Sequence, residues 1–397
     1  MNYNLIVLYL YGETNDQMYK MKYRILLLLA CFAVFPLFAQ GQLKVNPIGR
    51  MLVDAGCFDS KVEGLNNGMA IPDLRVGVKA SYGEYQAKLD VGYANGKVRL
   101  KDAFVQKNMG ESQLLMLGYF YPHFGMQAML SSSKKVAMEA PPVDDLFVGS
   151  RRIGAMYVYG KSAFWGAFTF AVEEEAMRKK TNETDGQGYG LLTRLLYRPY
   201  REEGRILHVG ISGAYDTPKY NEDEALNHHS FVFEGGYPTQ IADVQAVEAV
   251  VPDAKHMWRF TPEICAAYNK VAVEAQYYYT TVNRKNNLAF YQASGAYVQL
   301  RGLLKGTAYA YDSTDSWIAT PGQGSWECVL GYSYTDLNDD GCEIYGGRMN
   351  DASLTLNYYV NKYITWRLRY SYTHVEGRKG IASQSVNAIQ TRFQIVF

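Results

Sequence analysis

The sequence offers few residues of the types that perform acid–base or metal chemistry. His228 and His229 lie in an acidic segment and could bind a metal ion, although a solvated loop is the simpler interpretation. His208 and Ser212 are four residues apart on one strand face, about 13 Å, which is too far for a base and its nucleophile. No G-x-S-x-G, H-E-x-x-H or phosphate-cradling motif occurs. The sequence therefore predicts a protein that is not an enzyme and has no metal site or cofactor, with a hydrolase site assembled across strands as an alternative.

A second set of residues could bind anions if it lines a pore. Fixed positive charges lower the barrier for anions and raise it for cations, and guanidinium groups offer several donors to an oxyanion. Acidic residues, Asp90, Glu139, Asp144 and Asp145, lie among these basic ones, so each basic residue could also be an ordinary solvated position. The candidates for pore lining or anion binding are Arg75, Lys79, Lys88, Arg99, Lys101, Lys134 and Lys135.

An alternation of apolar and polar residues would position the first five candidates. Every second residue from 74 to 82 is apolar, the residues between are polar or small, and the pattern repeats from 85 to 93 after Gly83-Glu84. Similar stretches occur at 207–215, 354–360 and 366–372, the last two joined by Asn361-Lys362. A period of two predicts antiparallel strands with one apolar and one polar face, joined here by tight turns.

The N-terminus has the pattern of a secretory leader. Lys22 and Arg24 precede an apolar run from 25 to 39, which is too short to span a membrane as a helix. We therefore predict a signal peptide at 21–39, with 1–20 an upstream start-site artefact. No later apolar run approaches 18 residues, so the mature chain could cross a membrane only as a closed barrel.

Length and composition fit such a barrel. The chain has 397 residues, with 34 Tyr and 36 Gly, and its net charge of +1 argues against a nucleic-acid partner. We predict an N-terminal lead-in and first strand at 40–70 and an all-β transmembrane antiparallel barrel at 71–397, with about 16 strands. A secreted β-sandwich is the alternative fold. The segment 131–150 would fold into the lumen, and 173–187, 217–230, 336–347 and 376–385 would form external loops.

The C-terminus and the cysteines give two smaller predictions. Phe393, Ile395 and Phe397 share one face of the last strand, and a terminal Phe resembles the signal read by the barrel assembly machinery. After the leader four cysteines remain, and their spacing matches no zinc pattern. Cys328 and Cys342 flank a predicted hairpin, which makes them the better candidates for a disulfide, with Cys57 and Cys265 left over.

Several segments in order resemble the phosphate-selective porin O and P family: 98–105, 117–125 (LGYFYPHFG), 151–154, 295–299 and the closing block 325–397. The resemblance implies a barrel of about 16 strands, a homotrimer, inward loops, and Arg and Lys that pass anions along the channel. Gly306-Thr307 departs from the family, whose members often have an acidic residue after the Gly.

We therefore predict a porin in the outer membrane of a Gram-negative bacterium. It would contact outer-membrane lipid and form a water-filled channel for passive diffusion of small neutral or anionic solutes, with phosphate as a candidate. Small residues on the polar face leave space for an open bore, namely Gly77, Ser81, Gly92, Gly210 and Ser212. The alternatives are a plugged barrel with a structural or adhesive role and an outer-membrane hydrolase.

Overall fold

The computed structural model describes residues 42–397 except 95, 128 and 315. The predicted start-site artefact and signal peptide therefore lie outside the described residues. No helix in the described part of the chain is long and apolar enough to cross a membrane.

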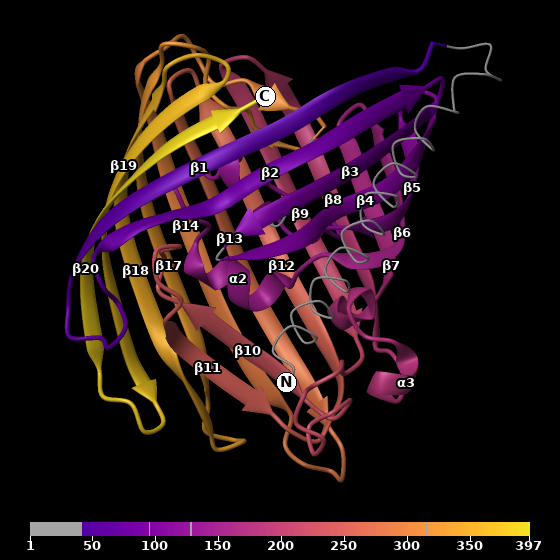
Figure 1. Ribbon diagram of the computed structural model, residues 1–397, viewed down its shortest axis with the longest axis vertical. Coiled ribbons are helices and arrows are strands. Elements are labelled where there is room, and N and C mark those ends of the chain that lie inside the picture. The colour runs from indigo at the N-terminus through magenta and orange to yellow at the C-terminus, as the bar shows by residue number, and fades with distance from the viewer. Residues whose placement is uncertain (1–41, 95, 128, 315) are drawn as a thin grey trace, which may run out of the picture.

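Sixteen antiparallel strands form one closed barrel, which confirms the predicted fold class and strand number. The first strand, β1, pairs with the last strand, β20, so the barrel sheet begins at Lys44 (Figure 1). The barrel strands are β1 (Lys44–Ser60), β2 (Gly68–Tyr82), β3 (Tyr85–Ala94), β4 (Lys97–Met109), β5 (Gln113–Phe120), β6 (Arg152–Lys161), β7 (Phe164–Val172), β8 (Tyr189–Glu202), β9 (Arg205–Asp216), β12 (Ala254–Tyr268), β13 (Val271–Arg284), β14 (Tyr291–Lys305), β17 (Trp326–Asp339), β18 (Ile344–Tyr359), β19 (Ile364–Arg378) and β20 (Gln384–Val396).

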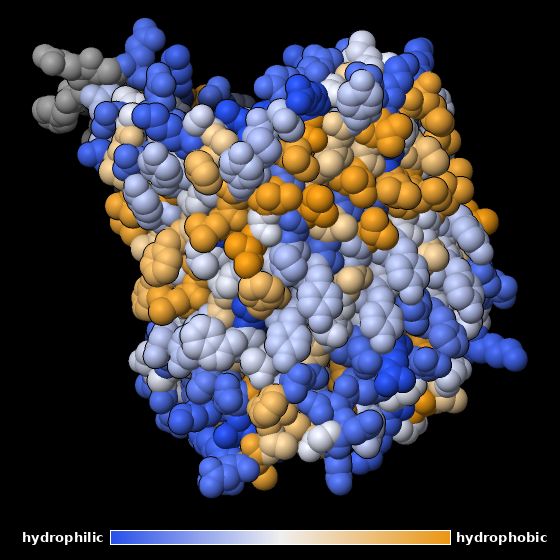
Figure 2. All heavy atoms as spheres, turned by 180° about the vertical axis from the view of Figure 1, so that it is seen from behind, coloured by the Kyte–Doolittle hydropathy of each residue, from blue (hydrophilic) through white to orange (hydrophobic). Residues whose placement is uncertain are grey.

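The barrel is apolar outside and polar inside, as a lipid-facing wall requires. In β2, Val76 is 63% exposed whereas its neighbour Arg75 is 9% exposed and points into the lumen. The predicted alternation of this strand is therefore confirmed, and the exposed apolar face excludes a sandwich, which would bury it. Figure 2 shows an orange and pale band of apolar and aromatic residues between two blue, hydrophilic ends.

The two ends of the barrel differ, and we call them the turn end and the loop end. At the turn end Phe397 and Gly49 exchange two backbone hydrogen bonds of 2.9 Å. The predicted tight turns, Gly83-Glu84 and the one at Asn361-Lys362, are confirmed there. The predicted long loop at 336–347 is wrong, because β17 continues to Asp339 and β18 begins at Ile344, leaving a four-residue turn at the loop end. Strands also occupy the edges of the predicted loop 376–385.

Three segments fold into the barrel. Residues 121–151, between β5 and β6, carry the 3-10 helix η2 (Ser132–Lys134) and the helix α2 (Pro142–Val148), which confirms the predicted inward loop. Residues 231–251 form a second sheet, β10 (Phe231–Gly236) with β11 (Gln245–Val251), and 306–325 form β15 (Tyr311–Asp312) with β16 (Trp317–Ile318). Outside the lumen, 173–188 carries η3 (Glu174–Met177) and α3 (Thr181–Thr184).

The core of the protein lies inside the barrel, where these segments pack on the wall. The Phe147 ring of α2 stacks on Tyr278 with 5.7 Å between centroids, and Phe233 of β10 packs beside it. Trp317 of β16 is 1% exposed and packs against Arg301. This apolar interior fixes the inward segments on the β8–β20 side, and the charged cavity described below lies against β1–β6.

The predicted disulfide is wrong. All four cysteines in the described chain are free. Cys328 opposes Gly302 and Leu356 near the turn end, whereas Cys342 lies in the turn after Asp339 at the loop end. About 11 residues of strand, roughly 35 Å, separate them, and a disulfide needs Cα atoms within about 7 Å.

Candidate functional site

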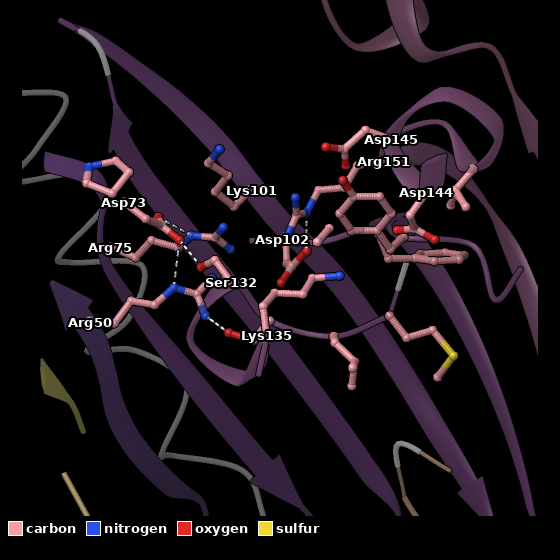
Figure 3. A pocket seen from close by; sticks show the side chains of 18 of the residues that line it. Arg50, Asp73, Arg75, Lys101, Asp102, Ser132, Lys135, Asp144, Asp145 and Arg151 are labelled. Carbon is pink, nitrogen blue, oxygen red and sulfur yellow. Dashed lines mark hydrogen bonds and ion pairs between the residues drawn. The ribbon is translucent and has the colours of Figure 1, made fainter. Parts of the chain in front are cut away.

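A charged cavity of about 520 Å³ lies between the wall strands β1–β6 and the inward segment 121–151 (Figure 3). The charged and polar residues that line it come from both sides, and the wall supplies most of the cations. They include Arg50, Asp73, Arg75, Lys88, Lys101, Asp102, Ser131, Ser132, Lys135, Glu139, Asp144, Asp145, Arg151 and Arg392.

Asp73 holds two of the arginines. Its carboxylate accepts hydrogen bonds from Arg50 Nε at 2.9 Å and from Arg75 Nε at 2.7 Å, and it also accepts from the Ser132 hydroxyl. A register shift between β1 and β2 at Leu52 accompanies this placement of Asp73 on the lumen side. This carboxylate clamp keeps both guanidinium groups along the wall, where Arg50 Nη1 also donates to the Ser131 hydroxyl and Arg75 Nη1 lies 3.7 Å from Asp90.

Asp102 forms the second clamp, further along the wall. It pairs with Lys88 and accepts a hydrogen bond of 2.7 Å from Arg151 Nε at the end of the inward segment. The Arg151 guanidinium lies over the Tyr121 ring at 4.4 Å. A register shift between β3 and β4 brings both Lys101 and Asp102 to the cavity, although they are consecutive in sequence.

Two amines in the cavity have no carboxylate partner in the described part of the chain. Lys101 forms no ion pair there. Lys135 donates to the backbone carbonyl and the side-chain oxygen of Gln127, the latter at 3.3 Å, and also forms no ion pair there. These amines are the groups in the cavity best placed to meet an anion.

Acidic residues of α2 face the same space. Asp144 is buried and accepts a hydrogen bond of 2.6 Å from the Tyr278 hydroxyl, while Asp145 opens onto the cavity. The Asp145 side chain touches the cavity, but the cavity itself is enclosed by the barrel. Burial within the barrel, together with repulsion from Asp144, raises the pKa of Asp145 to about 7. The charge of the cavity therefore depends on pH near neutrality.

The cavity contains four of the seven predicted basic residues. Arg75, Lys88, Lys101 and Lys135 line it. Lys79 and Arg99 are exposed elsewhere along the wall, and Lys134 turns away to pair with Asp312 at 3.4 Å.

Sequence reasoning missed Arg50, Arg151 and Arg392, which also line the cavity. Alternation in the first strand could have indicated Arg50, and the family-like element 151–154 contains Arg151. Arg392 lies on the lumen face of the last strand, and its alternation with the exposed Phe393 is the sequence signal that indicates it.

Most other arginines in the lumen donate hydrogen bonds to backbone carbonyl oxygens of the inward segments. Arg259 donates to the carbonyl oxygens of Phe147 at 2.7 Å and Val148 at 2.9 Å, at the C-terminal end of α2. Arg367 donates to the Ser133 carbonyl at 2.9 Å, and Arg369 to that of Pro238 at 3.0 Å. Since these guanidinium groups are buried, they hold the inward segments in place and do not bind a solute.

The histidines considered for chemistry have structural partners. His208 Nε2 lies 2.7 Å from Glu263 Oε1, and Ser212 Oγ accepts a hydrogen bond of 3.0 Å from the Gly125 backbone. The inward segment thus fills the space expected beside Ser212, and the side chains of Leu196 and Glu263 fill the space beside Gly210. His228 contacts the carbonyl oxygen of Thr184 at 2.7 Å, and no metal-binding cluster occurs among the described residues.

The fold and the cavity together define an outer-membrane porin: a closed barrel with an apolar outer band, a charged lumen and an inward segment that narrows the bore. More specifically, the chain belongs to the phosphate-selective porin O and P family, whose model matches residues 46–397.

Solved structures with this fold share little sequence with the chain. A loop-deletion mutant of OmpT, an outer-membrane protein of Vibrio cholerae, has a TM-score of 0.56 at 10% identity, covering 89% of this chain and 99% of that one. An anion-selective porin from Comamonas acidovorans has a TM-score of 0.56 at 10% identity, covering 90% and 100%. The outer-membrane channel DcaP of Acinetobacter baumannii has 0.51 at 12% identity, covering 89% and 97%. No curated protein matches the chain.

Proposed function

We propose that this porin passes small anions, inorganic phosphate among them, by passive diffusion along the cavity beside segment 121–151. The observation that carries the proposal is the pair of amines, Lys101 and Lys135, that face the cavity without a carboxylate partner in the described chain. An anion can exchange part of its hydration shell for these donors, since neither amine lies within ion-pair distance of a carboxylate in the described chain.

The two aspartate clamps suit diffusion rather than tight binding. Asp73 and Asp102 neutralise part of the charge of Arg50, Arg75, Lys88 and Arg151, so the cavity attracts an anion weakly enough to release it. They also hold the arginines against the wall, where a flexible cationic side chain would otherwise enter the path of the solute.

Planar-bilayer recording tests the proposal. The purified porin should show discrete conductance steps, an anion-directed reversal potential in a potassium chloride gradient, and a reduced chloride current when phosphate is added. One positive charge about 5 Å from an anion contributes roughly 0.8–3 kcal/mol at effective dielectric constants of 80 to 20. Lys101→Gln should therefore lower the anion-to-cation permeability ratio at least about fourfold.

Lys79→Gln is the matched control for this experiment. It removes the same charge from an exposed lysine of the neighbouring wall that does not line the cavity, so its effect should be much smaller. Equal effects of the two variants would contradict the proposed route. Discrete steps with no ion preference would leave a porin without anion selectivity, and a folded protein without conductance would favour a plugged barrel.

We further propose that residues 21–39 are a cleaved signal peptide and that 1–20 come from an upstream start site. We also propose that the barrel assembly machinery recognises Phe397 and that the mature porin is a homotrimer. One solved relative, OmpT of Vibrio cholerae, is described in a trimer form. Cross-linking of the purified porin and N-terminal sequencing of the mature chain test these points.

A further inference from the structure

The cavity has an apolar wall as well as a cationic one. Phe104 of β4, Met116 and Phe120 of β5 and Met156 of β6 all line it. Three of them belong to one buried apolar cluster, and Phe104 packs against that cluster. The inward segment adds Met129, Leu130 and Met138 to the same lining. An inorganic anion, fully hydrated and without apolar surface, gains nothing from such a wall.

Charged and apolar groups follow one another along the barrel wall. On β4, Lys101 and Asp102 precede Phe104 in the direction of the turn end. One step further in that direction, strand pairing sets Met116 directly opposite Met156. At about 3.3 Å per residue, the lysine amine and the phenyl ring are attached roughly 10 Å apart along the wall. A solute whose charged group lies at Lys101 would therefore place its body against the apolar residues.

The side chains of this wall can adapt to different shapes. Methionine is unbranched and polarisable, so a pair of methionines fits aliphatic chains and aromatic rings without a fixed geometry. The volume of about 520 Å³ falls in the range typical of pockets for small organic molecules.

We infer that the preferred solute of this cavity is a small organic anion, a monocarboxylate with a short aliphatic chain or one ring, rather than inorganic phosphate. This inference rests on the proposed anion pathway and names the class of solute that uses it. The carboxylate interacts with Lys101 and Arg151, and its apolar body lies on Phe104, Met116 and Met156. Each CH₂ group removed from water contributes about 0.8 kcal/mol when fully buried, which corresponds to about fourfold in affinity.

Block of the chloride current by a homologous series tests the inference on the unaltered protein. Acetate, butyrate and hexanoate carry the same charge at pH 7 and differ only in their chains. We expect the half-blocking concentration to fall by two- to fourfold for each added CH₂, and hexanoate to block at least tenfold more strongly than phosphate. A flat series, with hexanoate no better than acetate, would overturn the inference.

A variant and its control then locate the effect. Met116→Gln with Met156→Gln should flatten the series, so that hexanoate blocks no more strongly than acetate. Leu114→Gln is the matched control, because Leu114 packs against the same cluster but does not line the cavity, and it should keep the series. Loss of the series in the control as well would assign the effect to general disturbance of the wall and overturn the inference.

The outcomes separate this inference from the function on which it rests. Anion-directed reversal potentials and block by phosphate, combined with a flat carboxylate series, would keep the anion pathway and refute the organic solute. A reversal potential near zero with no block by any anion would refute both.

Discussion

Replacing Arg392 should loosen the inward segment beside the cavity. Arg392 is 2% exposed, and its guanidinium donates to Asp54 at 2.7 and 2.6 Å, to the Met138 carbonyl and to Glu139. Arg392→Gln would leave the carboxylates of Asp54 and Glu139 facing each other without their cation. Removing one partner of a buried ion pair costs about 3–5 kcal/mol.

This cost falls on one short part of the segment. The residues near Met138 and Glu139 lose their contacts with the Arg392 guanidinium. Arg367 still donates to the Ser133 carbonyl, and Arg259 still donates to the carbonyls at the end of α2. Since 1.4 kcal/mol is a factor of ten, the displaced state should become about 10²- to 4 × 10³-fold more populated. Met138 and Glu139 line the cavity, so their displacement widens it. Single-channel recording should show frequent excursions to a larger conductance.

Two further variants make the measurement decisive. Arg392→Gln combined with Asp54→Asn removes one of the unpaired carboxylates. The double variant should therefore show far fewer excursions to the larger conductance than Arg392→Gln alone. Arg369→Gln is the matched control, since Arg369 is equally buried and paired with Asp351 but holds Pro238 instead. An unchanged conductance in a correctly folded Arg392→Gln barrel would refute the reasoning, as would an identical effect of Arg369→Gln.

Three other outcomes follow from the structure. Asp145, with its pKa raised to about 7, is largely protonated below neutrality and ionised above it, so anion preference should fall as pH rises from 5 to 8, and Asp145→Asn should remove this dependence in reversal-potential measurements. Gly118→Ala should prevent barrel assembly, measured as the yield of heat-modifiable protein, because its φ is +138° and a Cβ would lie 2.3 Å from the Ala103 carbonyl oxygen. Unfolding without reductant should expose Cys328 and Cys342 as free thiols to maleimide, and a mass showing a disulfide would contradict the strand placement.

The fold could be predicted because a strand has a period of two. The order of Leu74, Arg75 and Val76 is enough to place Arg75 on the opposite face of the strand from its two neighbours. This alternation repeats along the chain, and no later apolar run is long enough for a membrane-spanning helix. A closed barrel is therefore the form in which the chain could span a membrane. The same rule correctly directed Arg75 and Lys88 to the lumen.

The inward sheets were missed because their pattern is the same as that of the wall. The strands at 231–236 and 245–251 alternate as wall strands do, and their apolar face meets α2 and the barrel interior instead of lipid. The segment 131–150 was recognised because prolines and mixed charges interrupt the alternation.

The identity of the cavity residues was decided by the tertiary structure. Lys79 and Lys101 have the same charge and the same predicted face, yet only Lys101 lines the cavity, and Lys134 and Lys135 are neighbours that point to different partners. Alternation is a local property of one strand, so the sequence alone specified the faces of the barrel. Ion pairing depends on strand register, on bulges and on segments more than a hundred residues away, and these are settled only when the barrel closes around its inward segments.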